Sequence, residues 1–148
     1  MAALVEQSGF DFYARLTSRT ADPRARNGFR YLRDDEAVHK SWFLSQLRAG
    51  GNTPRGDLSA GLRDRLDRDF LEPTEGFFSS GSADDTDSAL RVGSELARRS
   101  INLYSAMRDA VTPGQKAELG RIITEEEAHA NTLESLRSVP EQGAPRGD

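Results

Sequence analysis

The chain has 148 residues, a formal net charge of −4 and charges of both signs along its length. This length is that of one domain with a core of its own, and the mixed charge excludes a basic surface for nucleic acid or anionic membranes. The absence of cysteine excludes disulfides, thiolate zinc sites and iron–sulfur centres. No apolar run approaches the ~20 residues of a membrane span, so we expect a cytoplasmic protein without a membrane partner.

The first predicted helix covers Ala2 to Arg19 and places a carboxylate on its apolar stripe. Glu6, Phe10 and Tyr13 follow one another at the helical period. We therefore expect Glu6 to face the core.

The second predicted helix opens at Asp22-Pro23, a cap followed by a proline, and stops at Gly50-Gly51. Its apolar stripe between Phe29 and Leu47 includes Glu36 and His39. Burying a carboxylate and an imidazole is costly unless a partner charge or a metal compensates them.

A long connection from Gly50 to Asp85 follows, which we interpret as connective. Its middle, Asp57 to Phe70, repeats an apolar residue every four positions and predicts a short amphipathic helix. A third helix is predicted from Asp84 to Ala110. The fourth begins after Thr112-Pro113 and ends near residue 137, which leaves 138–148 as a mobile tail.

Both histidines of the chain stand three residues after a glutamate on an apolar stripe, in Glu36-Ala-Val-His39 and Glu126-Glu-Ala-His129. Glu and His at this spacing project from one helical face. Two such motifs favour a dimetal site between helices. The alternative is a pair of buried histidine–glutamate hydrogen bonds without metal.

The two motifs belong to an internal repeat with an offset of about 90 residues. Besides the motifs, Tyr13 matches Tyr104 and Pro23 matches Pro113. Two similar hairpins related by a pseudo-twofold axis would bring the motifs face to face.

These residues resemble the rubrerythrin family of ferritin-like proteins over nearly the whole chain except the crossover and the tail. The resemblance rests on Glu6 with Tyr13 seven residues later, on both Glu-x-x-His motifs, and on Ser100-Ile-Asn-Leu-Tyr104. It implies an all-α, ferritin-like four-helix bundle over residues 1–137, with a long crossover that carries a short extra helix. It also implies two irons bound by carboxylates and histidines.

The resemblance carries over five metal ligands, namely Glu6, Glu36, His39, Glu126 and His129. The family's third-helix glutamate falls on Ala97, and Glu95 is the nearest carboxylate. We favour Glu95 as a surface residue paired with arginines, while a π-bulge would turn it inward as a sixth ligand. Without Glu95, three carboxylates leave one of the four positive charges of two divalent ions uncompensated. A hydroxide or small anion must then offset this charge, and we expect weak metal binding or a single bound metal.

Residues beside the motifs have two interpretations. Asp34, Asp35, Glu125 and Glu127 are solvated charges, which we favour, or partners of a ligating histidine. The tyrosines of the repeat pack in the core or hydrogen-bond near the site.

The ligand types suit iron or manganese, and zinc would also bind. We predict a di-iron oxidoreductase that acts on ferrous iron, oxygen or peroxide and takes electrons from an external donor. No catalytic residue is assigned. The alternative is a non-enzymatic metal-binding or interaction module with an incomplete site. Because the short first helix leaves its neighbours' apolar faces poorly covered, a homodimer is compatible with both.

Overall fold

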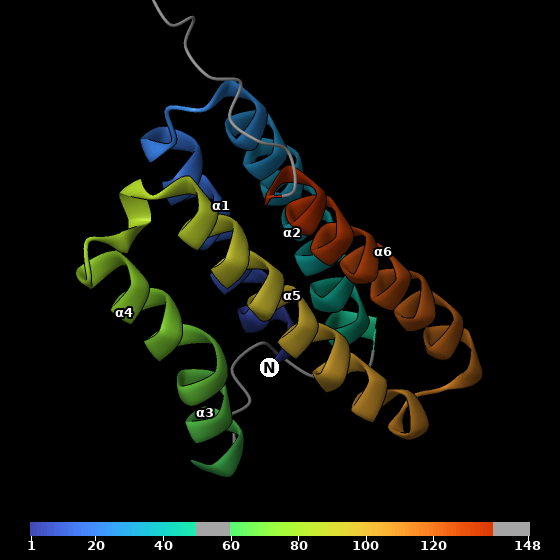
Figure 1. The fold of residues 1–148 in the computed structure, drawn as a ribbon. Helices are drawn as coiled ribbons and strands as arrows, with labels where there is room; N and C mark the ends of the chain where they lie inside the picture. Colours follow the sequence, from blue (N-terminus) through green and yellow to red (C-terminus); the bar gives the residue numbers. More distant parts are fainter. Residues whose placement is uncertain (50–59, 138–148) are drawn as a thin grey trace, which may run out of the picture.

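Four long helices form two helical hairpins. The computed structural model describes residues 1–49 and 60–137, and these are all-α. Helices α1 (Ala2–Arg19) and α2 (Pro23–Ala49) make one hairpin, and α5 (Thr86–Met107) and α6 (Pro113–Arg137) make the other (Figure 1). The hairpins pack as in a helical bundle, with α1 against α5 and α2 against α6.

The predicted helices are confirmed, with small shifts at their ends. The Asp22 carboxylate caps α2 by accepting a hydrogen bond from the Arg24 backbone N–H at 2.9 Å. Helix α5 begins two residues later than predicted, because Ser82–Asp84 form a 3₁₀ turn and Asp85 caps the helix through the Ser88 N–H. A second 3₁₀ turn, Arg108–Ala110, follows α5.

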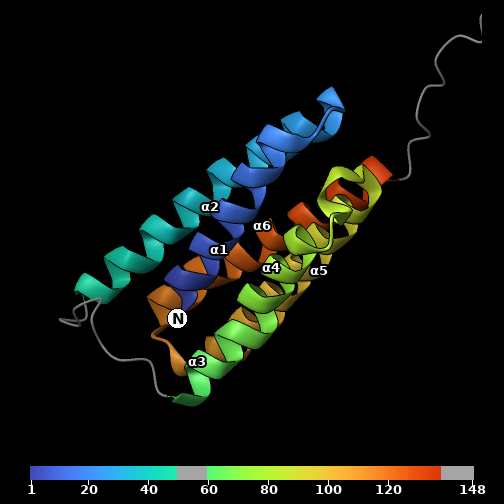
Figure 2. The same cartoon turned by 90° about the vertical axis from the view of Figure 1, so that its left-hand side faces the viewer.

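The crossover lies along one side of the bundle. Helix α3 (Ala60–Leu66), a π-helical segment η1 (Asp67–Leu71) and α4 (Glu72–Ser79) form a nearly continuous rod beside α5 (Figures 1 and 2). This rod returns the chain to the end where α2 began, so α2 and α5 run in the same direction (Figure 1). The predicted amphipathic helix is confirmed from residue 60 onward, and its first residues lie outside the described ranges.

Helix α4 decides which face of α1 is buried. The sequence placed Phe10 on the core stripe, but Phe10 is only half-buried and Phe12 is completely buried. The ring of Phe12 packs against Phe77 and Phe78 of α4, with ring centroids 5.9 and 5.8 Å apart. Helix α1 therefore has a third apolar neighbour, which its own periodicity could not indicate.

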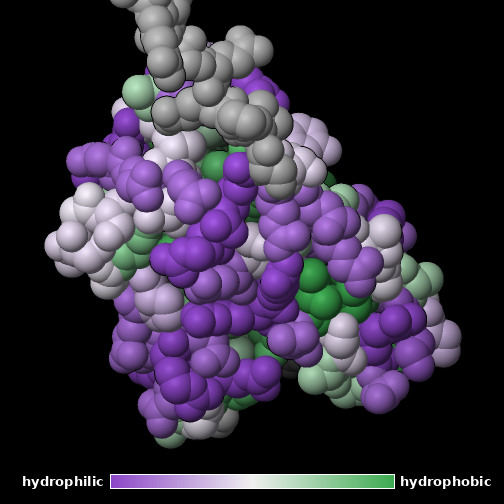
Figure 3. Space-filling model, in the orientation of Figure 1, coloured by the Kyte–Doolittle hydropathy of each residue, from purple (hydrophilic) through white to green (hydrophobic). Residues whose placement is uncertain are grey.

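The face turned to the viewer in Figure 3 is mostly hydrophilic, with apolar side chains visible between the charged ones. Within residues 1–49 and 60–137, no helix has the length and apolar character needed to cross a membrane. The predicted tail, residues 138–148, lies outside the described part of the chain.

Candidate metal centre

A cluster of acidic and imidazole side chains is buried where the two hairpins meet. Glu6, Glu36, His39 and Glu126 each offer one donor atom, and these atoms all lie within 4.8 Å of one another. The four residues are at most 5% exposed. His129, which is 2% exposed, lies at the edge of the cluster. The fold thus brings together residues from α1, α2 and α6 that stand up to about 120 positions apart.

Glu126 lies between the two histidines. Its Oε1 is 3.2 Å from His39 Nδ1, and its Oε2 is 3.5 Å from His129 Nδ1. The imidazole rings stack with centroids 5.8 Å apart. His39 Nδ1 also lies 3.5 Å from Glu6 Oε2, and His129 Nδ1 lies 3.8 Å from Glu36 Oε1. Each histidine therefore turns its Nδ1 towards the cluster, and the Glu126 carboxylate contacts both rings.

The outer nitrogen of each histidine contacts a carboxylate of the opposite hairpin. His39 Nε2 lies 2.5 Å from Glu125 Oε2, and His129 Nε2 lies 3.0 Å from Asp35 Oδ2. Arg121 contacts the other oxygen of Glu125 at 2.6 Å. The favoured interpretation of Asp35 and Glu125 as merely solvated charges was wrong. Such carboxylates fix the ring orientation and tautomer of a metal-binding histidine.

Helix α1 meets the cluster at two points. The hydroxyl of Tyr104 donates a hydrogen bond to Glu6 Oε1, so this tyrosine orients a carboxylate as well as packing in the core. At Gly9, a Cβ atom would stand 3.0 Å from Cδ of Glu36. The absence of a side chain at Gly9 is therefore what lets Glu36 lie against α1.

The cluster is electrostatically unbalanced when it holds no cation. Burial, together with the neighbouring Glu126 and Glu6 carboxylates, raises the pKa of Glu36 well above its ordinary value. Burial opposes a charge on His39, but the neighbouring Glu126 and Glu6 carboxylates outweigh it and raise the pKa of His39 to about 11. For His129, too, burial is outweighed, and Glu126 and Asp35 raise its pKa.

Glu126 shows the complementary shift. Burial alone would raise its pKa, but the neighbouring His129 and His39 imidazoles outweigh burial and lower the pKa of Glu126. Protons on Glu36 and the imidazoles thus offset the carboxylate charge in the metal-free protein. A bound cation would take over this role, so metal binding should release protons.

The residues present fit a metal. Glu6 Oε2 and His129 Nδ1 are buried and have no hydrogen-bond partner, although buried polar atoms are normally paired. A cation placed among the donors would satisfy both atoms. Carboxylates and imidazoles without thiolates suit iron, manganese or zinc. Glu6, Glu36, His39 and Glu126 could hold one ion, and Glu36, Glu126 and His129 could contribute to a second.

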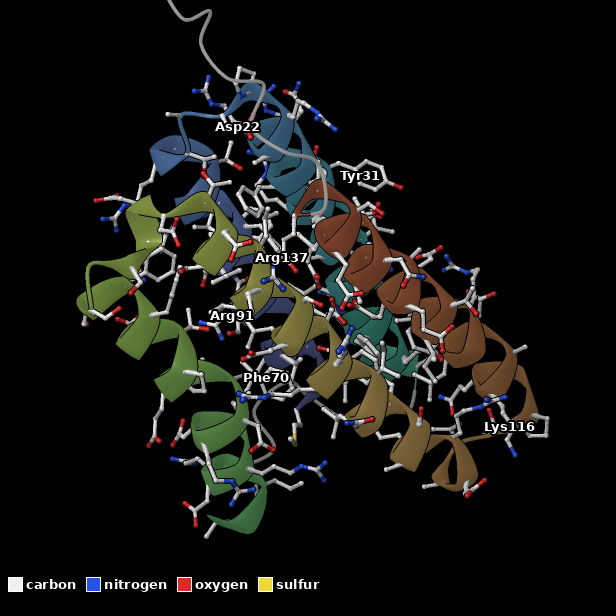
Figure 4. The ribbon with its side chains drawn as sticks, in the orientation of Figure 1. Asp22, Tyr31, Phe70, Arg91, Lys116 and Arg137 are labelled. Carbon is white, nitrogen blue, oxygen red and sulfur yellow. The ribbon has the colours of Figure 1, made fainter. Side chains whose placement is uncertain are left out.

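Glu95 is not brought to this cluster. Its carboxylate is half-exposed on α5 and accepts a hydrogen bond from Arg91 Nη1 at 3.0 Å; the labelled Arg91 lies on the same helix in Figure 4. The π-helical turns of the described chain lie at Asp67–Leu71 and not in α5, so the helix keeps Glu95 outside. Ala97 of α5 instead borders a small cavity that Glu36 and Glu126 also line.

Comparison of the chain with known protein families, with curated proteins and with solved structures finds no match.

Proposed function

We propose that this chain is a ferritin-like, rubrerythrin-type metalloprotein with iron as its native metal. The observation that carries the proposal is the position of Glu126, whose two oxygens face the Nδ1 atoms of His39 and His129. A carboxylate between two imidazoles is the arrangement expected of a ligand shared by two ions. The parallel course of α2 and α5, enforced by the crossover, also agrees with a ferritin-like bundle (Figure 1).

The proposed activity is oxidation of ferrous iron coupled to reduction of oxygen or peroxide. When bound, redox-active ions supply electrons. In the peroxide reaction, one peroxide would take up two of these electrons and two protons and form two waters. An external reductant, either further ferrous iron or another protein, must restore the ferrous state, since the chain has no cysteine for a built-in iron–sulfur centre.

The chain's own residues bind, orient and exclude water. Asp35 and Glu125 fix the outer nitrogens of the two histidines, so that the Nδ1 atoms face inward. Tyr104 orients Glu6 in the same way, because its hydroxyl donates a hydrogen bond to the Glu6 carboxylate. The cluster is almost fully buried, so charges develop there without bulk water to screen them.

Aerobic consumption of ferrous iron and of peroxide tests this activity. The native protein should consume one or both faster than a variant with Glu36→Ala and His39→Ala. Glu127→Ala is the matched control, because Glu127 is an exposed neighbour of Glu126 on α6. Equal rates for native protein and the double variant would refute the oxidoreductase.

A second candidate is a non-enzymatic metal-binding module. It is favoured by Ala97 and by the surface position of Glu95, which leave three carboxylates at the inner site. Under this alternative, a metal at 100 times its dissociation constant stabilises the folded state by about 2.7 kcal/mol. No turnover of ferrous iron or peroxide should accompany that stabilisation.

A further inference from the structure

The two halves of the internal repeat place different residues at the position of Glu6. The Tyr104 hydroxyl of α5 donates a hydrogen bond to Glu6 of α1. Its repeat equivalent, Tyr13, has no carboxylate to reach, since the repeat equivalent of Glu6 is Ala97. The Tyr13 hydroxyl instead points to the Gly93 carbonyl at 3.5 Å, which is long for an O–H···O hydrogen bond.

A cavity of about 10 Å³ lies where the missing carboxylate would stand. It is bordered by Ala97, by Tyr13 and by the two carboxylates Glu36 and Glu126. Phe70 closes it from the crossover; Figure 4 labels this ring beside α5. The crossover is therefore more than connective. A volume of this size holds one water-sized species and excludes larger anions.

Beside the two carboxylates that would hold the ions, the cavity is bordered by one phenol that can donate a hydrogen bond to an anion on the metal. Tyr13 is 2% exposed and its hydroxyl has only the long contact with Gly93. Three inner carboxylates, Glu6, Glu36 and Glu126, leave one positive charge of two divalent ions uncompensated. On the other side of the cluster, Glu6 and its hydrogen bond with Tyr104 occupy the equivalent place.

We propose that the cavity beside Ala97 binds one water-sized anion, hydroxide or its analogue fluoride, which completes the metal centre in place of a sixth protein carboxylate and accepts a hydrogen bond from Tyr13. The inference rests on the proposed metal site but not on its catalytic activity. The two sides of the metal centre then differ, because the side next to Tyr13 has an exchangeable anion where the side next to Tyr104 has Glu6.

Fluoride titration of the Co²⁺-loaded protein, followed by visible absorption, tests the proposal without turnover. The native protein should show a saturable spectral change. Ala97→Val fills the cavity with methyl groups and should weaken fluoride binding at least tenfold. Tyr13→Phe removes the donor and should weaken it about tenfold. Ala106→Val is the matched control, since it adds the same methyl groups at an exposed position of α5 and should leave the fluoride affinity unchanged.

The outcomes separate this inference from the proposed function. If Co²⁺ binds but fluoride causes no change, or causes the same change in Ala97→Val and Tyr13→Phe as in native protein, the anion site is refuted and the metal site stands. If Co²⁺ does not bind the native protein, the metal site itself fails, and the anion site with it. Tyr13→Phe keeps the test decisive if Ala97→Val does not fold.

Discussion

Replacing Gly9 by alanine tests whether the Glu36 carboxylate belongs to the donor set. The new Cβ would lie 3.0 Å from Glu36 Cδ, 3.1 Å from Oε2 and 3.3 Å from Oε1. The carboxylate would have to move by a few tenths of an ångström, and it is enclosed by Glu6 and Glu126. Because disturbing a group that supports metal ligands typically costs 10-fold to 100-fold in affinity, we expect about that loss for Gly9→Ala.

The stability of the metal-free protein should change much less than its affinity. Alanine gains about 1 kcal/mol over glycine in a helix, whereas crowding in a packed core costs about 1–3 kcal/mol. The free energy of unfolding of Gly9→Ala should therefore fall by about 0–2 kcal/mol. Gly120→Ala in α6 is the control, since its Cβ would meet only Arg108 Nη2 at 3.9 Å. It should gain about 0.5–1 kcal/mol and bind metal normally.

Calorimetric titration with Zn²⁺ and urea unfolding of the metal-free proteins give both quantities. If Glu36 is a ligand, Zn²⁺ binding is weakened in Gly9→Ala and not in Gly120→Ala. Native affinity in a folded Gly9→Ala variant would mean that Glu36 does not bind the metal from the position described.

Three further predictions concern protons and hydrogen bonds. The pKa of His39 is raised from 6.5 to about 11, so above pH 6.5 the folded state keeps a proton that the unfolded chain releases. Urea unfolding of the metal-free protein should show stability falling from pH 6.5 to 9, with a contribution from His39 alone that reaches about 1.4 kcal/mol per pH unit, and rising stability would contradict the shift. Tyr104→Phe leaves Glu6 without its donor and should cost about 1–3 kcal/mol in urea unfolding. An unchanged midpoint would show that this hydrogen bond is dispensable. Asp35→Asn and Glu125→Gln should each weaken Zn²⁺ binding about 10-fold to 100-fold in calorimetry, and native affinity in both would reduce them to surface charges.

Helical periodicity explains how much of the fold the sequence could predict. The four long helices and the inward position of Glu6, Glu36 and Glu126 follow from apolar stripes, caps and prolines, which are local signals. The sequence could not indicate which of Phe10 and Phe12 is the more buried, because the deciding contact comes from α4, more than 60 residues away. Local patterns carry no information about a third neighbour.

The surroundings of the histidines could not be predicted for a related reason. Asp35 and Glu125 each stand one residue before a buried glutamate, about 100° around the helix from it, so periodicity places them at the surface. Their carboxylates reach histidines 94 and 86 positions away in the chain, on the opposite hairpin. The internal repeat could have indicated these contacts, because Asp35 and Glu125 occupy equivalent positions and each contacts the histidine of the other hairpin.

The most direct test of the account is the metal content of protein expressed with iron, measured by elemental analysis beside Glu126→Gln and Glu95→Gln. Glu126 faces both histidines in the buried cluster, whereas Glu95 lies at the surface against Arg91. We expect iron to be bound in stoichiometric amount by the native protein and by Glu95→Gln, and to be lost from Glu126→Gln. A native protein without metal, or equal metal in Glu126→Gln, would contradict it.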